Sequence, residues 1–253
     1  MGDFALKVQG TSVSKGSLGV FFLGQAGFLF KCPDGTLVGL DLYLSDCCER
    51  YVGFKRLMPH LLAANELTLD YLVATHAHYD HFDPDSVPLL MANGHTELIA
   101  AKDVEKECAK LHIVENVTYI SCGDRISRGG ITITAVPCDH GAKTPYAVGL
   151  LIEAEGKKIY FMGDTCYRPD LLENKALQDV DLLLLPINGA FGNLNESEAA
   201  KVVSILRPRL SVPCHFWNFA EHGGNPALFR QAMKDEAPDS EYILMRQGES
   251  VII

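Results

Sequence analysis

The chain has 253 residues, of which 47% are hydrophobic, which is enough to bury a sizeable core in one α/β domain spanning residues 1–253. Its formal net charge of -10 argues against a nucleic-acid surface, which usually needs a basic patch, and no apolar stretch reaches the length of a membrane span. The start of the chain shows no secretion signal, and eight irregularly spaced cysteines fit reduced thiols, so a cytoplasmic location is expected.

The apolar patterns of the chain predict strands that alternate with helices. The expected strands are, in chain order, residues 18–23, 27–31, 36–42, 69–75, 117–121, 131–136, 147–154, 158–162, 180–185, 210–212, 242–245 and 250–253. The expected helices are residues 86–93, 101–111, 195–206 and 226–234. The stretch 45–66 is irregular. Because the strands gather in two sets, we expect two sheets packed face to face with the helices outside.

A histidine-rich motif, His76-Ala77-His78-Tyr79-Asp80-His81, directly follows the predicted strand 69–75. Extended residues two positions apart point to the same side, so His76 and His78 can share one ion. A loop that leaves a strand is also a common home for active sites in α/β proteins. The alternative is a set of surface histidines on a loop, but the spacing favours a metal-binding motif.

Three further candidate ligands each follow a predicted strand. They are His140, Asp164 and His215, after the strands 131–136, 158–162 and 210–212. Taken alone, each is weak, because a histidine or aspartate at the end of a strand is often a cap or a surface residue. Together they occupy the same position relative to a strand as the first motif, so we expect one site.

These residues, in this order, resemble the motifs of the metallo-β-lactamase superfamily, and Asp41 matches the aspartate of its first motif. The resemblance implies an α/β fold, a four-layer αββα sandwich, with a dinuclear site at the sheet edges. By position, it implies one metal held by His76, His78 and His140, a second held by Asp80, His81 and His215, and Asp164 bridging both.

Within the superfamily, the chain looks most similar to relatives of L-ascorbate-6-phosphate lactonase. The similarity lies in Gln25-Ala26-Gly27-Phe28 and in residues 41–46, 75–78 and 215–226. It implies hydrolysis of a small ester or lactone, a class that includes sugar-phosphate lactones. Imidazole and carboxylate ligands suit zinc or manganese, so two divalent ions of either kind are expected. The nucleophile would be a hydroxide bridging the metals, and Asp80 would be catalytic by orienting it.

Other functions use the same ligands and remain open. A phosphodiesterase or nuclease of the same fold is the main alternative, although the acidic balance of the chain weighs against a nucleic-acid substrate. β-Lactam hydrolysis ranks lower because no export signal is visible. A metal-binding scaffold without activity is disfavoured, since a protein that has lost its activity has no need to keep every ligand.

A basic group in the irregular stretch, formed by Arg50, Lys55 and Arg56, predicts a small anionic substrate. The alternative is a solvated face on which these residues pair with Asp46 and Glu49. Three residues near the ends of later strands are further candidates for substrate contacts, or else they only stabilise their loops: Asn188, His222 and Asn225. The expected partner is therefore a small molecule, without nucleic acid or membrane, and assembly into a homo-oligomer is left open.

Overall fold

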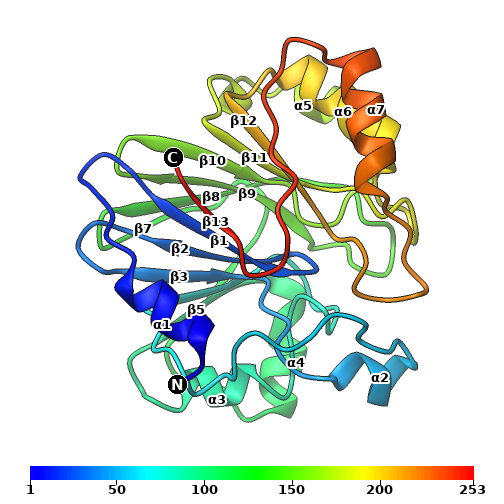
Figure 1. Ribbon diagram of the computed structural model, residues 1–253. Coiled ribbons are helices and arrows are strands. Elements are labelled where there is room, and N and C mark those ends of the chain that lie inside the picture. The colour runs from blue at the N-terminus through cyan, green and yellow to red at the C-terminus, as the bar shows by residue number, and fades with distance from the viewer.

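The computed structural model describes residues 1–253 and has two β-sheets at its centre, packed face to face (Figure 1). The first sheet has seven strands in the order β13-β1-β2-β3-β4-β5-β6: β1 (Gly19–Gly24), β2 (Gly27–Lys31), β3 (Leu37–Leu40), β4 (Tyr71–Ala74), β5 (Glu97–Ala101), β6 (Val117–Ile120) and β13 (Ser250–Ile252). The second has six in the order β12-β11-β10-β9-β8-β7: β7 (Arg125–Arg128), β8 (Ile131–Pro137), β9 (Val148–Ala154), β10 (Lys157–Phe161), β11 (Leu182–Pro186) and β12 (Leu210–Cys214).

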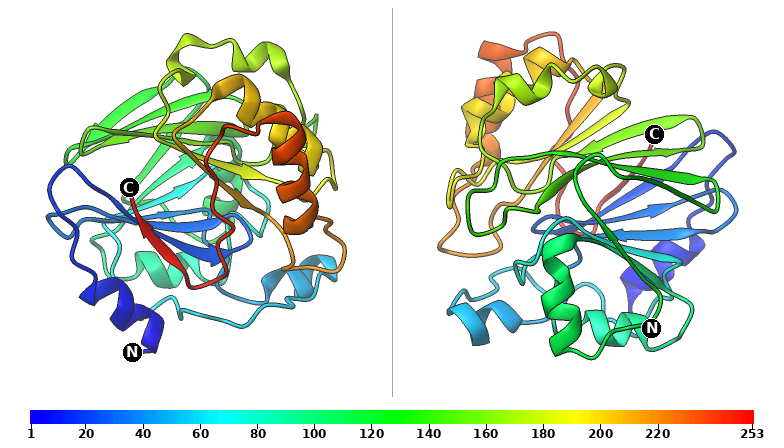
Figure 2. Two further views of the ribbon diagram at one scale, coloured as in Figure 1. Left: turned by 45° about the horizontal axis from the view of Figure 1, so that its top comes forward. Right: turned by 180° about the vertical axis from the view of Figure 1, so that it is seen from behind.

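Helices cover the outer face of each sheet, as Figure 2 shows from two further directions. Those outside the first sheet are α1 (Asp3–Gly10), α3 (Val87–Met91), the short 3₁₀ helix η1 (Lys102–Val104) and α4 (Glu105–Lys110). Those outside the second are α5 (Pro169–Leu172), the 3₁₀ helix η2 (Lys175–Leu177), α6 (Glu196–Leu206) and α7 (Pro226–Glu236). The predicted four-layer αββα sandwich is confirmed. No helix combines the length and the apolarity needed to cross a membrane.

Alternating side chains on the strands build two cores. On β1, Val20 and Phe22 point into the large cluster between the sheets, whereas Phe21 and Leu23 pack towards the helices of the first sheet. Successive strand residues face opposite sides, so a strand covered on both faces needs an unbroken apolar run. This explains the sequence of β1, and also that of β11, where all five residues are buried.

The direction of the strands brings several loops to one edge of the sandwich. In the first sheet, β3 and β4 are parallel neighbours. In the second, β10, β11 and β12 are parallel, and β8 runs in the same direction as β10 because each is antiparallel to β9. The carboxyl ends of parallel strands meet at the same edge of a sheet. The segments after β4, β8, β10 and β12 therefore meet there.

Several predicted elements differ from the structure. The predicted helix 101–111 is present as η1 and α4, which together cover residues 102–110, and Ala101 belongs to β5, a strand that the pattern missed. The predicted strand 242–245 is reduced to an isolated bridge between Tyr242 and Ser211. The pattern missed α1, the mostly polar edge strand β7, and α2 (Cys47–Val52) in the stretch 45–66. Short runs of this kind do not distinguish helix from strand by periodicity alone.

Candidate metal centre

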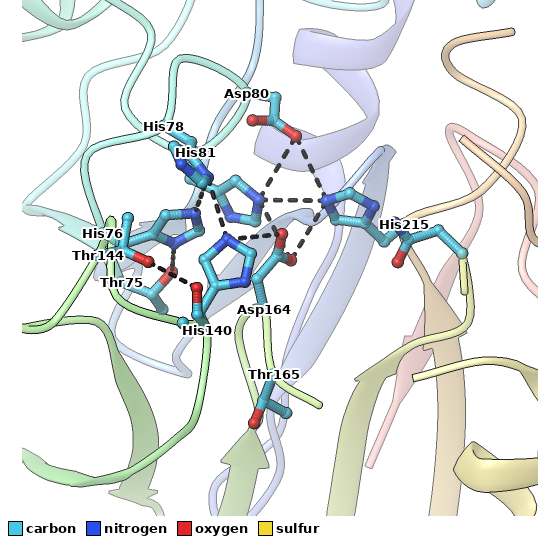
Figure 3. A network of polar contacts seen from close by, with 12 residues as sticks. Thr75, His76, His78, Asp80, His81, His140, Thr144, Asp164, Thr165 and His215 are labelled. Atoms are coloured by element: carbon cyan, nitrogen blue, oxygen red, sulfur yellow. Dashed lines mark hydrogen bonds and ion pairs between the residues drawn. The ribbon is translucent and has the colours of Figure 1, made fainter. Parts of the chain in front are cut away.

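Seven side chains converge at the shared edge of the two sheets (Figure 3). Four come from the segment after β4 and three from the ends of β8, β10 and β12: His76, His78, Asp80, His81, His140, Asp164 and His215. The structure therefore brings together all the ligands that the sequence predicted, although they span 140 positions from first to last.

Three imidazoles form the first group of the centre. The Nδ1 atom of His78 lies 3.0 Å from Nε2 of His76 and 3.1 Å from Nε2 of His140. A tetrahedral zinc site with Zn–N bonds of about 2.0–2.1 Å has edges of about 3.3 Å between its ligand nitrogens. The three facing nitrogens are thus close to the spacing that one shared ion requires.

The second group consists of Asp80, His81 and His215. The two imidazole Nε2 atoms lie 3.2 Å apart, and Oδ2 of Asp80 lies 3.5 Å from Nε2 of His81 and 3.3 Å from Nε2 of His215. All three side chains present one ligand atom to a common point. Their nitrogen and oxygen donors, without thiolate, suit zinc or manganese.

Asp164 lies between the two groups. Its Oδ2 atom is 3.6 Å from Nε2 of His140 in the first group, and its Oδ1 atom is 3.3 Å from Nε2 of His81 and 3.2 Å from Nε2 of His215 in the second. Oδ1 is buried, and beyond these ion-pair contacts with the two Nε2 atoms it has no hydrogen-bond partner. A buried carboxylate oxygen needs a donor or a cation beside it, and an ion held by His81 and His215 would supply that charge.

Asp41 orients one ligand of each group. Its Oδ2 atom lies 2.6 Å from Nδ1 of His81 and accepts a hydrogen bond from Thr75 Oγ1 at 2.5 Å. The Thr75 hydroxyl, which donates to Asp41, can accept in turn from Nδ1 of His76 at 3.1 Å. Both rings then carry their proton on Nδ1 and leave Nε2 free to face the centre. Hydrogen bonds of this kind fix the tautomer of metal-binding histidines.

Burial and neighbouring charges set the protonation of the two groups differently. In the first, burial lowers the pKa of His140 to about 4 and that of His76 well below its usual range, so both imidazoles are neutral. In the second, burial also opposes the charge, but the carboxylate of Asp164 outweighs it and raises the pKa of His215 to about 9. Without an ion, a proton on His215 therefore balances the negative charge of the carboxylates in the second group. A divalent cation bound there would take the place of that proton.

A cavity of about 600 Å³ opens beside the centre, and proposed ligands from both groups line it. Asn188 and His222, two of the predicted substrate contacts, also line it. The Oδ1 atom of Asn188 is buried without a hydrogen-bond partner, and burial lowers the pKa of His222 to about 4. Both side chains are thus placed to meet a bound molecule.

Sequence reasoning missed Gln25 as a site residue. It lies at the tight turn between β1 and β2 with a positive φ of 54°, and it is fully buried. Its Nε2 atom donates to Oδ2 of Asp80 at 2.8 Å and lies 3.2 Å from Nδ1 of His222. The signals in the sequence were a polar residue between two glycines in an apolar hairpin and the place of Gln25 in the segment 25–28 that resembles the lactonase relatives.

The predicted basic group does not reach the cavity. Arg50 donates to the carboxylate of Asp85, at 2.5 and 2.6 Å, on the surface. Arg56 lies over the ring of Tyr43 at 4.0 Å and donates to its carbonyl oxygen. Lys55 is not in the lining either, where the single Lys or Arg is Lys143. The geometry therefore does not support the prediction that these three residues contact the substrate.

Asn225 has a structural role and lies outside the cavity, although it lines a neighbouring groove. It is the N-cap of α7, and its Oδ1 atom accepts a hydrogen bond from the backbone N–H of Ala227 at 2.9 Å. An asparagine at this position satisfies an N–H group that the helix leaves unpaired. The side chain does not line the cavity beside the centre.

Comparison with known proteins places this centre in a family. A family model described as a beta-lactamase superfamily domain matches residues 43–216. The UPF0173 metal-dependent hydrolase of Thermococcus onnurineus is 32% identical over 226 residues, which make up 82% of this chain and 96% of that protein. The UPF0173 metal-dependent hydrolase of Methanopyrus kandleri is 29% identical over 242 residues, or 91% of this chain and 98% of that protein.

Solved structures agree on the fold. Igni18, a metallo hydrolase from Ignicoccus hospitalis, superposes with a TM-score of 0.73 at 21% identity, covering 94% of this chain and 98% of that one. The metallo-beta-lactamase fold protein YhfI from Bacillus subtilis gives a TM-score of 0.71 at 18% identity, covering 94% and 99%. The chain therefore belongs to the beta-lactamase superfamily and is a metal-dependent hydrolase of the metallo-β-lactamase fold.

Proposed function

We propose that this hydrolase cleaves a small carboxylic ester or lactone with two divalent ions, zinc or manganese, in the cytoplasm. The observation that carries the proposal is Asp164, whose two carboxylate oxygens face two separate groups of ligands beside one cavity. Two ions bound there would activate a water molecule and polarise the scissile carbonyl group. The eight unpaired cysteines are consistent with a reducing compartment.

The chain's own residues prepare the reaction by holding groups in place. Gln25 donates to Asp80, so the Asp80 carboxylate has a fixed orientation next to the cavity. The opposite orientation of the Gln25 amide would set two oxygens against each other, which makes this arrangement the stable one. His222 is neutral at physiological pH and, with Asn188, offers hydrogen-bonding atoms to the substrate. Asp80 and Asp164 are the two carboxylates of the centre that also line the cavity.

The charge of the lining favours an ester or lactone with at most one anionic group. Lys143 is the single Lys or Arg that lines the cavity, and an anionic group on the substrate would meet it. A sugar-phosphate lactone needs more than a single point charge to hold its phosphate, because phosphate sites usually combine several donors. We therefore favour a lactone or ester without phosphate over the sugar-phosphate lactone.

The test is a substrate comparison on freshly purified protein after its metals have been quantified. The protein reconstituted with zinc or manganese is offered simple lactones, p-nitrophenyl esters and bis-p-nitrophenyl phosphate. We expect hydrolysis of esters or lactones and little of the phosphodiester. Asp164→Ala should lose both metal and turnover, whereas Asp85→Ala, a change on the surface, should keep both. Efficient cleavage of the phosphodiester alone would replace this proposal with a phosphodiesterase.

A further inference from the structure

Part of the cavity lining is a cluster of aromatic rings. Phe54 lies with its ring centroid 5.6 Å from that of Phe191 and 5.9 Å from that of Phe219. All three rings also pack around His222, at centroid distances of 5.0 to 5.8 Å. His222 in turn stacks on the proposed ligand His215, at 4.8 Å and an interplanar angle of 16°. A continuous aromatic surface therefore leads from the metal centre into the cavity.

Large apolar side chains around this cluster remain open to water. Phe191 is 63% exposed and Val52 is 54% exposed, and both line the cavity. A neighbouring groove shares Phe219 and His222 with the cavity, and its own lining includes Leu57 and Trp217, which are also about half exposed. Apolar side chains gathered around a cavity in this way mark a surface that a ligand covers.

Among the charged groups of the same lining, Asp80 and Asp164 belong to the centre, and Glu107 and Lys143 are the two others. Arg50 and Arg56, on either side of Phe54 in the sequence, are held by Asp85 and by backbone carbonyl groups away from the cavity. Any hydroxyl group of a substrate that points at the phenyl rings would lack a hydrogen-bond partner there, which is unfavourable. The aromatic side of the cavity thus fits an apolar group of the substrate.

We propose that the substrate carries an apolar group, an alkyl chain or an aromatic ring, which packs against Phe54, Phe191 and Phe219. This inference rests on the proposed ester or lactone hydrolysis, since the reacting carbonyl group must lie at the metal centre. A longer group would continue into the groove beside Trp217. The aromatic cluster is then the part of the site that determines substrate specificity.

A binding experiment tests the cavity without requiring turnover. Trp217 is the only tryptophan, so its fluorescence reports on the groove. We expect a saturable change with 1-octanol and with 2-phenylethanol, and none with ethanol at the same concentration; these neutral alcohols do not compete for metal as carboxylates do. Phe191→Ala should weaken 1-octanol binding about tenfold. Val114→Ala, which removes an 81% exposed side chain elsewhere, is the matched control and should bind as the wild type does.

A hydrolysis series separates this inference from the proposed function. On the metal-loaded protein, kcat/KM should rise about two- to fourfold per methylene from p-nitrophenyl acetate to the octanoate. Phe191→Ala should lower kcat/KM for the octanoate about tenfold more than it lowers kcat/KM for the acetate. Binding of 1-octanol without hydrolysis of any ester or lactone would support the apolar site and overturn the proposed reaction. Equal kcat/KM for all chain lengths, with no binding of 1-octanol, would overturn the apolar site and leave the reaction standing.

Discussion

Replacing Asp41 with asparagine tests how the protein prepares its histidines to bind metal. Asp41 is fully buried and receives three donors: the backbone N–H of Thr75 at Oδ1, and the Thr75 hydroxyl and Nδ1 of His81 at Oδ2. Asparagine has one acceptor oxygen where aspartate has two. Whichever way its amide turns, an NH₂ group faces at least one of these donors.

The size of the effect follows from this mismatch. Losing one buried hydrogen bond to a charged acceptor lowers the free energy of unfolding by about 1.5–3 kcal/mol. If the amide NH₂ faces His81, the ring must accept at Nδ1 and carry its proton on Nε2, the atom that faces the centre. Removing the partner of a metal-binding histidine reduces metal affinity by about 10- to 100-fold. We therefore expect Asp41→Asn to bind the metal of the second group, which His81 would hold, about 10- to 100-fold less tightly.

The assay is titration of the metal-free protein with zinc by calorimetry, combined with thermal unfolding. Asp83→Asn is the matched control, because Asp83 is another fully buried carboxylate that accepts hydrogen bonds from Leu44 and Ser45. It has no hydrogen bond or ion pair with a proposed ligand, so it should lose stability but bind zinc within about threefold of wild type. Wild-type zinc affinity in Asp41→Asn, or an equal loss in Asp83→Asn, would refute the role assigned to Asp41.

Three further outcomes can be checked. Two divalent ions per chain are expected after reconstitution with excess zinc or manganese, and elemental analysis that finds no more than one would contradict a dinuclear centre. Asp80→Ala should abolish turnover while the circular dichroism spectrum stays unchanged, because Asp80 lies in a loop outside the strands; near-normal turnover in the folded, metal-loaded variant would remove its role. Gly224→Ala should lower the free energy of unfolding by about 2–4 kcal/mol in chemical denaturation, since φ is +92° and the new Cβ would lie 2.6 Å from Cβ of Phe216. Gly35→Ala, with φ of +96° and open space around it, should lose only about 1–2 kcal/mol.

The ligand set could be predicted from the sequence because its signals are local. His76, His78, Asp80 and His81 lie within six positions, and each remaining ligand follows an apolar strand. Because the ends of parallel strands meet at one edge of a sheet, these positions predict that the ligands converge, and no tertiary contact has to be known. The strands themselves were found wherever an apolar run was long or alternated, as in β8, and were missed where the run was short or polar, as in β7.

The surroundings of the ligands could not be predicted, because they depend on pairing between distant segments. Gln25 enters the centre through the β1–β2 turn, and nothing in its neighbours shows which polar side chain a hairpin buries. The aromatic cluster joins Phe54 to Phe191 and Phe219, more than 130 positions further along the chain. Arg50 and Arg56 appeared free to bind a ligand because the sequence does not show their partners. Only the tertiary structure brings Asp85 to Arg50 and the carbonyl oxygens of residues 43 and 45 to Arg56.

Each group of ligands takes side chains from both sheets. In the first, His76 and His78 follow β4 while His140 follows β8, and in the second, Asp80 and His81 face His215 from the end of β12. Ions bound here would act as crosslinks between the two halves of the sandwich. A ligand that binds only the folded state raises the free energy of unfolding by about 2.7 kcal/mol when its free concentration is a hundred times its Kd. The supply of metal would therefore also govern how long the protein survives proteolysis. Starvation for metal would then deplete the protein itself as well as its activity.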